Sequence, residues 1–422
     1  MPDVSLASRV LALEAGPADL LVLPTDVRDV VSFRGSFESA PDLGVADDVV
    51  QSLVAGLLDK GTKHRDRFEV SEALEGRGAQ LSFYSDGLRM GFAGRALRDD
   101  LPDVIALLAE QLLEPALEDA EIEKAIVRAT ASVRRSREST GSQASGAFAR
   151  RLYGEAHPNY VLEPDDELDR LKALTPDEIR SYHETHVGSD GLTVAVVGDV
   201  DIEATQSAFA SALGEWARHG RSPQFEPSPA PQPPGRVVVE MADRRNLDVR
   251  IGHAVDLRRD SDDFLAAYAG VFALGGNFSG RLMQTVRDEQ GLTYGIGSDL
   301  GAPSVRHDGH VRVRVALSQE NLERGIEATR AEVAAFVLEG VSPEVLEQTQ
   351  TTLAGRHVVG LATTGGVAAR LLINAERGFE VGYLDAYPDL VSALTADDVT
   401  GAVQRHIRPD EFQVAVAGTL PE

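Results

Sequence analysis

The chain has 422 residues, of which 43% are hydrophobic and 26% charged. Its length exceeds what one hydrophobic core usually spans, and its composition is that of a globular protein rather than a disordered one. The 67 acidic and 41 basic residues give a net charge of -26, which disfavours nucleic acids and anionic membrane surfaces as partners. The chain contains no cysteine, so disulfides, thiol nucleophiles and thiolate metal sites are excluded, and any metal would need histidine and carboxylate ligands.

We expect neither a membrane span nor a signal peptide from the sequence. No apolar run reaches the length of about 18 to 20 residues that spans a bilayer, and residues 1–10 lack the basic and then apolar order of a signal peptide. We therefore expect a cytoplasmic protein, or a periplasmic one if an export signal has been removed.

In chain order, the predicted elements alternate between short strands and longer helices. The strands are predicted at Asp29–Phe33, Gln80–Phe83, Arg236–Glu240 and His310–Ala316. The helices are predicted at Val45–Leu58, Leu101–Leu113, Ala120–Arg137, Ser261–Ala273 and Leu322–Leu338. Interleaved strands and helices with short connections indicate an α+β fold.

An internal duplication relates the two halves of the chain. Residues 174–200 and 394–420 align without gaps at a constant offset of 220, and each copy reads as a helix followed by a buried strand. Thr175 and Thr395 are the expected N-caps, each followed by acidic residues in the first turn. The repeat predicts two α/β sandwich domains of similar design.

A proline-rich stretch, residues 219–235, lies between the two copies and has no apolar periodicity. We interpret it as an extended linker. The predicted domains are therefore residues 1–218 and 236–422, joined by this linker as a clamshell.

The histidines offer weak metal sites. His183 and His186 are spaced for one helix face but have no evident third ligand, and His186 aligns with His406 in the duplicate, which favours a scaffold role. His307 and His310 flank Asp308 in a loop-like stretch, where solvent exposure is expected.

The most distinctive segment is glycine-rich, residues 275–297, and it lacks the spacing of a phosphate-binding loop. Residues 280–290 have helical composition, Gly291 can end that helix, and residues 292–298 resume as a strand. Arg287 and Tyr294 could converge there to donate hydrogen bonds to a peptide carbonyl or an oxyanion. Composition alone favours the alternative, a solvated arginine on a helix face and a tyrosine packed in the sheet.

At this segment the chain resembles the pitrilysin/insulinase family of zinc peptidases, which includes mitochondrial processing peptidase, and the resemblance spans nearly the whole chain. Residues 33–63, ending in Lys60-Gly61-Thr62, look like its opening strand and first helix. Ser279-Gly280-Arg281-Leu282, followed by Arg287 and Tyr294, is similar to the segment that bears the family's substrate-binding Arg/Tyr pair. The resemblance makes Arg287 and Tyr294 the substrate-binding residues, whereas Ser279, Arg281 and Gly291 shape the loop.

The first half departs from the family's zinc site. Active members carry H-x-x-E-H on the first helix, and no such motif occurs in these 422 residues. Counting back from Lys60, the two histidines and the catalytic glutamate correspond to Ser52, Gly56 and Ala55, and the third ligand falls near Ala131 and Ser132. We expect no catalytic zinc chemistry, no metal and no cofactor in this chain.

Some bacterial members of this family divide the site between two chains, one with the zinc motif and one with the Arg/Tyr pair. The resemblance implies that this chain is the second kind, inactive alone, which presents Arg287 and Tyr294 to an unfolded peptide held at the zinc of an H-x-x-E-H-bearing paralogous subunit. A structural or assembly protein and a peptide-binding homodimer, neither with a proteolytic role, are the alternatives.

Overall fold

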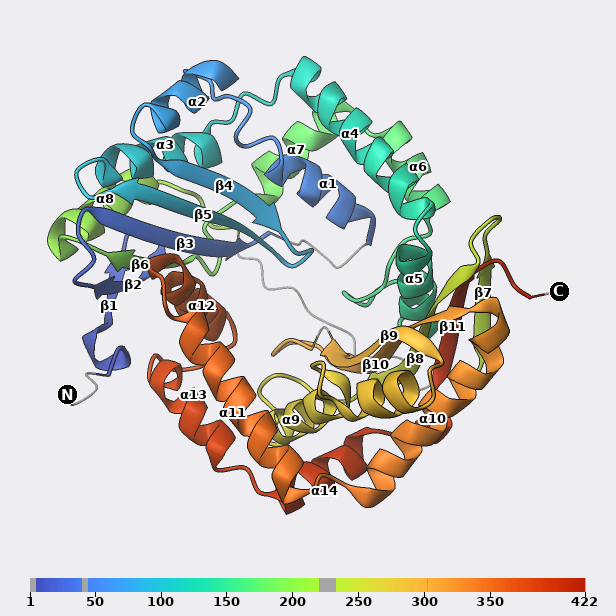
Figure 1. Ribbon diagram of the computed structural model, residues 1–422. Coiled ribbons are helices and arrows are strands. Elements are labelled where there is room, and N and C mark those ends of the chain that lie inside the picture. Colours follow the sequence, from blue (N-terminus) through green and yellow to red (C-terminus); the bar gives the residue numbers. More distant parts are fainter. Residues whose placement is uncertain (1–4, 40–44, 220–232, 302, 422) are drawn as a thin grey trace. The chain divides into compact units, whose positions relative to one another are not determined.

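The computed structural model describes residues 5–39, 45–219, 233–301 and 303–421, and the chain forms two compact units (Figure 1). Unit 1 comprises Met1–Ala131, Asp165–Gln224 and His357–Tyr387, and unit 2 comprises Ser132–Pro164, Phe225–Arg356 and Pro388–Glu422. Most of the predicted linker, residues 220–232, lies outside the described residues.

Unit 1 is built on a six-stranded sheet whose strand order is β1-β2-β6-β3-β5-β4. The strands are β1 Leu11–Ala15, β2 Ala18–Pro24, β3 Val30–Glu38, β4 Gln80–Ser85, β5 Arg89–Leu97 and β6 Thr193–Gly198. Its helices are η1 Ala7–Arg9, α1 Val45–Ala55, α2 Arg67–Glu75, α3 Leu101–Leu113, α6 Pro164–Ala173, α7 Pro176–His186, α8 Ile202–Leu213 and α12 Thr364–Glu376.

Unit 2 is built on a five-stranded sheet whose strand order is β7-β11-β8-β10-β9. The strands are β7 Arg236–Glu240, β8 Asn246–Val255, β9 Thr293–Gly301, β10 Gly309–Ser318 and β11 Gln413–Gly418. Its helices are α5 Thr140–Leu152, α9 Phe264–Gly275, η2 Met283–Glu289, η3 Gln319–Asn321, α10 Leu322–Glu339, α14 Ala396–His406 and η4 Pro409–Glu411. Among the described residues, four helices have residues in both units: α6, of which only Pro164 belongs to unit 2, and α4 Asp119–Arg137, α11 Pro343–Gly360 and α13 Tyr383–Ser392.

The duplication predicted from the sequence is visible in the structure. Helices α7 and α14, and strands β6 and β11, occupy positions that differ by 220 residues. Thr175 accepts a hydrogen bond from the Glu178 backbone, and Thr395 forms a capping box with Asp398. With β1 set aside, the two sheets have the same strand order. The α+β fold with two duplicated sandwich-type domains is confirmed.

The compact units do not coincide with the two halves of the sequence. Helix α5, from the first half, packs on β8 and β11 in unit 2, where Phe148 and Leu152 are buried. Helix α12, from the second half, packs on β3 and β6 in unit 1, where Ala368 and Leu371 are buried (Figure 1). Each half therefore contributes one helix to the sheet formed by the other half.

No single helix in the described residues is long and apolar enough to cross a membrane, and α11 and α12 meet the length and composition criteria only when taken together. The apolar face of α12 is covered by unit 1, since Leu371 and Leu372 are each 2% exposed.

Candidate functional site

Glycines at the end of helix α9 and in the loop after it allow the helix to end directly against strand β9. A Cβ atom on Gly275 would lie 2.8 Å from the backbone nitrogen of Ser298, and one on Gly280 would lie 2.8 Å from the Cα of Gly275. Real side chains do not tolerate such distances. The connecting loop is thereby held close to β9, and it leaves Phe278 84% exposed.

Arg287 is placed by a π-helical turn, η2. The Gln290 N–H donates to the Thr285 carbonyl five residues back, at 3.1 Å, and Gly291 ends the helix with a φ of +64°. Arg281, at the start, forms ion pairs with Glu332 and Glu339 of α10. The predicted helix is present, and its π geometry is of a kind that often occurs at functional sites.

Tyr294 is placed by a bulge at the start of β9. The pairing with β10 skips from Gly295 to Thr293, which leaves Tyr294 as the extra residue. The Thr293 hydroxyl donates to the Ala316 carbonyl and accepts from the Gly295 N–H at 3.1 Å. Bulges redirect side chains, and Tyr294 is 89% exposed with the Arg287 guanidinium 5.6 Å from its ring centre. The structure thus brings the two predicted residues together.

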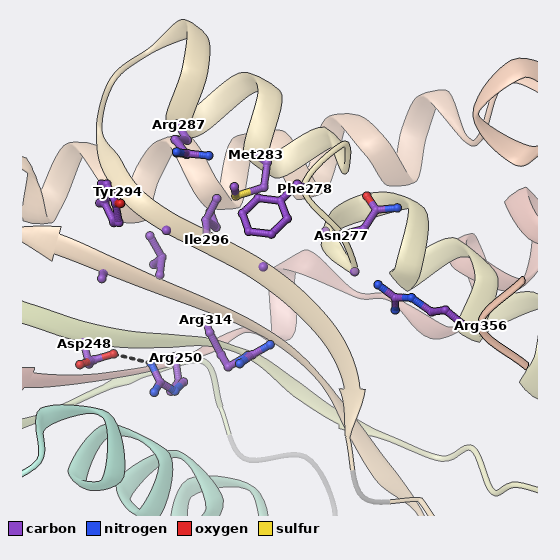
Figure 2. Close-up of a pocket in the computed structure, with 16 residues that line it drawn as sticks. Asp248, Arg250, Asn277, Phe278, Met283, Arg287, Tyr294, Ile296, Arg314 and Arg356 are labelled. Atoms are coloured by element: carbon purple, nitrogen blue, oxygen red, sulfur yellow. Dashed lines mark hydrogen bonds and ion pairs between the residues drawn. The ribbon is translucent and has the colours of Figure 1, made fainter. Parts of the chain in front are cut away.

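These two side chains line a cavity of about 610 Å³ around strand β9 (Figure 2). Figure 2 shows Phe278 and Met283 on the same side of β9 as Arg287, and Arg314 on the other side. The lining also includes Arg250 from β8 and Arg356 from α11, along with Asn277, Ile296 and Asp248. The cavity therefore combines an apolar wall with several hydrogen-bond donors.

Strand β9 is the edge of its sheet, and in the described residues its only strand partner is β10. Gly295 and Gly297, both on β9, line the cavity, and a Cβ atom on Gly295 would meet nothing within 4 Å. An edge strand has unpaired backbone donors and acceptors that can bind another extended chain. The edge of β9 beside the cavity can therefore accept the backbone of another extended chain.

Comparison with known proteins identifies the family of the chain. Residues 173–353 match the family model for the peptidase M16 inactive domain, and residues 48–152 match the model for insulinase, peptidase family M16. The chain belongs to the insulinase (M16) family. Its sequence lacks the H-x-x-E-H motif, and proteins named as non-peptidase or inactive are among its relatives.

Its relatives include proteins named as zinc proteases and proteins named as inactive homologues. It is 25% identical over 404 residues to an uncharacterized zinc protease of Streptomyces coelicolor. This alignment covers 92% of the present chain and 83% of that protein. It is 22% identical over 331 residues to a non-peptidase homolog of Helicobacter pylori, covering 77% of this chain and 73% of that protein. The crystal structure of a peptidase M16 inactive domain from Pseudomonas fluorescens covers 98% of both chains with a TM-score of 0.86 at 20% identity.

The residues at the M16 zinc positions do not fit a zinc ion. Ser52 and Gly56 are exposed and Ala55 is 4% exposed at the end of α1, so one hydroxyl is the only side-chain donor among them. Neither Ala131 nor Ser132 carries a nitrogen or carboxylate ligand of the kind that zinc prefers. Among the residues that the structure describes, no group of three histidines and carboxylates could hold a metal.

The histidines considered as metal ligands have partners in the protein. His183 Nε2 lies 2.8 Å from the Leu112 carbonyl, and burial lowers its pKa. His186 stacks on Tyr182, and its duplicate His406 lies 3.0 Å from Asp263. These contacts stabilise the helices that carry the histidines.

The expected exposure of His307 and His310 is wrong. They are 8% and 7% exposed, because the segment after α5 packs against the loop between β9 and β10. Tyr153 from that segment hydrogen-bonds His310 at 2.9 Å. Burial lowers the pKa of His310 to about 4.

Three other arginines that line the cavity were not among the residues predicted from the sequence. Arg250 is 7% exposed and donates to Ser145 at 3.0 Å and to Asp248 at 3.1 Å, so it ties α5 to β8. Arg314 and Arg356 are exposed. The alternation of valine and arginine along residues 311–315 is the one signal that could have placed Arg314 on a polar sheet face.

Proposed function

We propose that this chain is the non-catalytic, peptide-binding subunit of a heterodimeric zinc metallopeptidase. The observation that carries the proposal is the convergence of Arg287 and Tyr294 beside the unpaired edge of β9. The Arg287 guanidinium lies 5.6 Å from the centre of the Tyr294 ring. Cleavage belongs to a partner subunit that has the H-x-x-E-H motif, because the corresponding positions here, such as Ser52 and Gly56, cannot bind the metal.

Each element of the groove has a role in this proposal. The backbone of β9 pairs with an extended peptide, which holds the peptide without regard to most of its side chains. The Arg287 guanidinium donates to a peptide carbonyl oxygen, and the Tyr294 hydroxyl donates to the same region or to the oxyanion that forms there.

The contacts of the two residues support a binding role over a structural one. Tyr294 is 89% exposed, so its ring adds little to the core. The carboxylate that pairs with Arg287 is Asp288, its neighbour in sequence, at 3.9 Å. Arg281, six residues earlier, shows the contrast, because two glutamates of α10 hold it.

Hydrogen exchange on a trapped complex tests the proposal. The chain is mixed with an H-x-x-E-H paralogue whose motif glutamate is changed to glutamine, and with an unstructured peptide that this partner can bind but not cut. We expect slower exchange at backbone amides of residues 293–301, and loss of that protection in the Arg287→Ala variant. The matched control is Arg245→Ala, an exposed arginine of unit 2 outside the cavity. Protection confined to other strands, or equal protection in Arg287→Ala, would refute the proposed groove.

A further inference from the structure

The strand register places a row of small and cationic residues on one face of the unit 2 sheet. Arg314 on β10 lies opposite Arg250 on β8 and opposite Gly297 on β9, so the three share one sheet face. Helix α5 contacts β7, β8 and β11 on this sheet. The Arg314 side chain is 54% exposed, and Gly297 beside it has no side chain to cover it.

Arg356 approaches the same cavity from a different element. It is exposed on α11, and its guanidinium lies 4.7 Å from the ring centre of Phe272. Within the described part of the chain, no carboxylate forms an ion pair with it. In Figure 2 the Arg356 side chain extends toward the cavity from the side that carries Asn277.

The charges around the cavity do not balance. Four guanidinium groups line it, from Arg250, Arg287, Arg314 and Arg356, with one carboxylate, Asp248, which Arg250 binds. Outside the lining, Arg312 and Arg314 share Asp299, at 2.9 and 3.0 Å, and Asp288 lies 3.9 Å from Arg287. Five guanidinium groups therefore face three carboxylates. The cavity therefore carries surplus positive charge in a chain whose net charge is -26.

We propose that this cavity is a carboxylate subsite that gives the peptide groove its specificity, with Arg314 and Arg356 as the specificity-determining residues. The inference rests on the proposed function. It assigns the substrate class of the groove as peptides that carry a carboxylate next to the bound segment. Guanidinium groups match a carboxylate in shape and can donate two hydrogen bonds to it. The acidic remainder of the chain repels such peptides, so attraction is confined to the cavity.

Calorimetric titration of the intact chain, without any partner, tests this proposal. Three peptides of one Gly/Ser/Leu sequence are compared: one with two central glutamates and an amidated C-terminus, one with glutamines at those positions, and the glutamine peptide with a free C-terminal carboxylate. We expect at least one carboxylate peptide to bind about tenfold or more tightly than the amidated glutamine peptide, with the difference shrinking at high salt. Which of the two binds tightly shows whether the carboxylate comes from a side chain or from the chain end.

Charge-matched variants separate the cavity from general electrostatics. The double variant Arg314→Gln/Arg356→Gln is expected to reduce the difference between peptides to less than about threefold. The control Arg245→Gln/Arg324→Gln removes the same charge from exposed positions outside the cavity and is expected to keep the difference. Circular dichroism verifies that both variants fold.

The outcomes test the carboxylate subsite separately from the proposed peptide-binding function. Equal affinity for all three peptides would overturn the carboxylate subsite but not the peptide groove. The same holds if the difference in affinity between peptides is unchanged in Arg314→Gln/Arg356→Gln. Absence of binding for every peptide overturns both.

Discussion

A double-mutant cycle on Arg287 and Tyr294 measures whether the pair acts on substrate as a unit. The variants are Arg287→Ala, Tyr294→Phe and their combination, each mixed with an active H-x-x-E-H partner. Neither side chain is needed for the fold, since they are about 33% and 89% exposed respectively. We expect their free energies of unfolding to change by less than about 0.5 kcal/mol.

The expected losses follow from the bonds that each group would make. A hydrogen bond from a charged donor contributes about 1.5 to 3 kcal/mol, so Arg287→Ala should lower kcat/KM about 10- to 150-fold. A neutral hydroxyl contributes about 0.5 to 1.5 kcal/mol, so Tyr294→Phe should lower it about 2- to 12-fold. The guanidinium lies 5.6 Å from the ring centre, and an exposed contact of this kind couples the residues by about 0.5 to 1 kcal/mol.

The assay is hydrolysis of an unstructured peptide, with complex formation followed by size-exclusion chromatography. All variants should assemble like the native chain, and the double variant should lose less than the sum of the single losses. Turnover that is unchanged in both single variants would remove the substrate-binding role from this pair. Loss of assembly in either variant would assign the residues to the subunit interface.

Two further predictions concern stability. Burial lowers the pKa of His253 to about 4, and its neutral ring accepts a hydrogen bond from the Arg408 backbone N–H at 3.0 Å. Histidine in the unfolded chain has a pKa of about 6.5, so acidification from pH 7.5 to 5 protonates the unfolded state first. Through this group the free energy of unfolding should fall by about 2 kcal/mol over that range. Urea unfolding should show that His253→Gln lacks this part of the pH dependence, and an identical pH dependence would contradict the assignment. Gly94→Ala should destabilise unit 1 by about 1 to 3 kcal/mol, because its Cβ would lie 2.1 Å from the ring of Phe33. Gly154→Ala, with no atom within 4 Å of its Cβ, is the control, and equal melting temperatures for the two variants would refute the packing argument.

The local structure of the repeat could be predicted because its signals are contiguous in sequence. Thr175 and Thr395 each precede acidic residues that complete a helix start, and both caps form as expected. Helix α3, Leu101–Leu113, has the predicted bounds. The exchange of α5 and α12 between sheets could not be predicted, because it depends on contacts between segments far apart in the chain.

The site was predictable only in part for the same reason. Arg287 and Tyr294 stood out through a family resemblance, whereas the bulge and the π-helical turn that direct them are tertiary features. Arg356 reaches the cavity from a helix 62 residues beyond Tyr294 in the numbering of the chain, and no local pattern links the two. His310 was misjudged because its burial depends on Tyr153, which is distant in sequence.

The central claim is that this chain holds a peptide that another chain cuts. The most direct test measures zinc content and cleavage of an unstructured peptide for this chain alone, for an H-x-x-E-H partner alone, and for their mixture. We predict full cleavage only in the mixture, with zinc bound to the partner. Stoichiometric zinc together with cleavage by this chain alone would contradict the account, and so would a mixture that leaves the peptide intact.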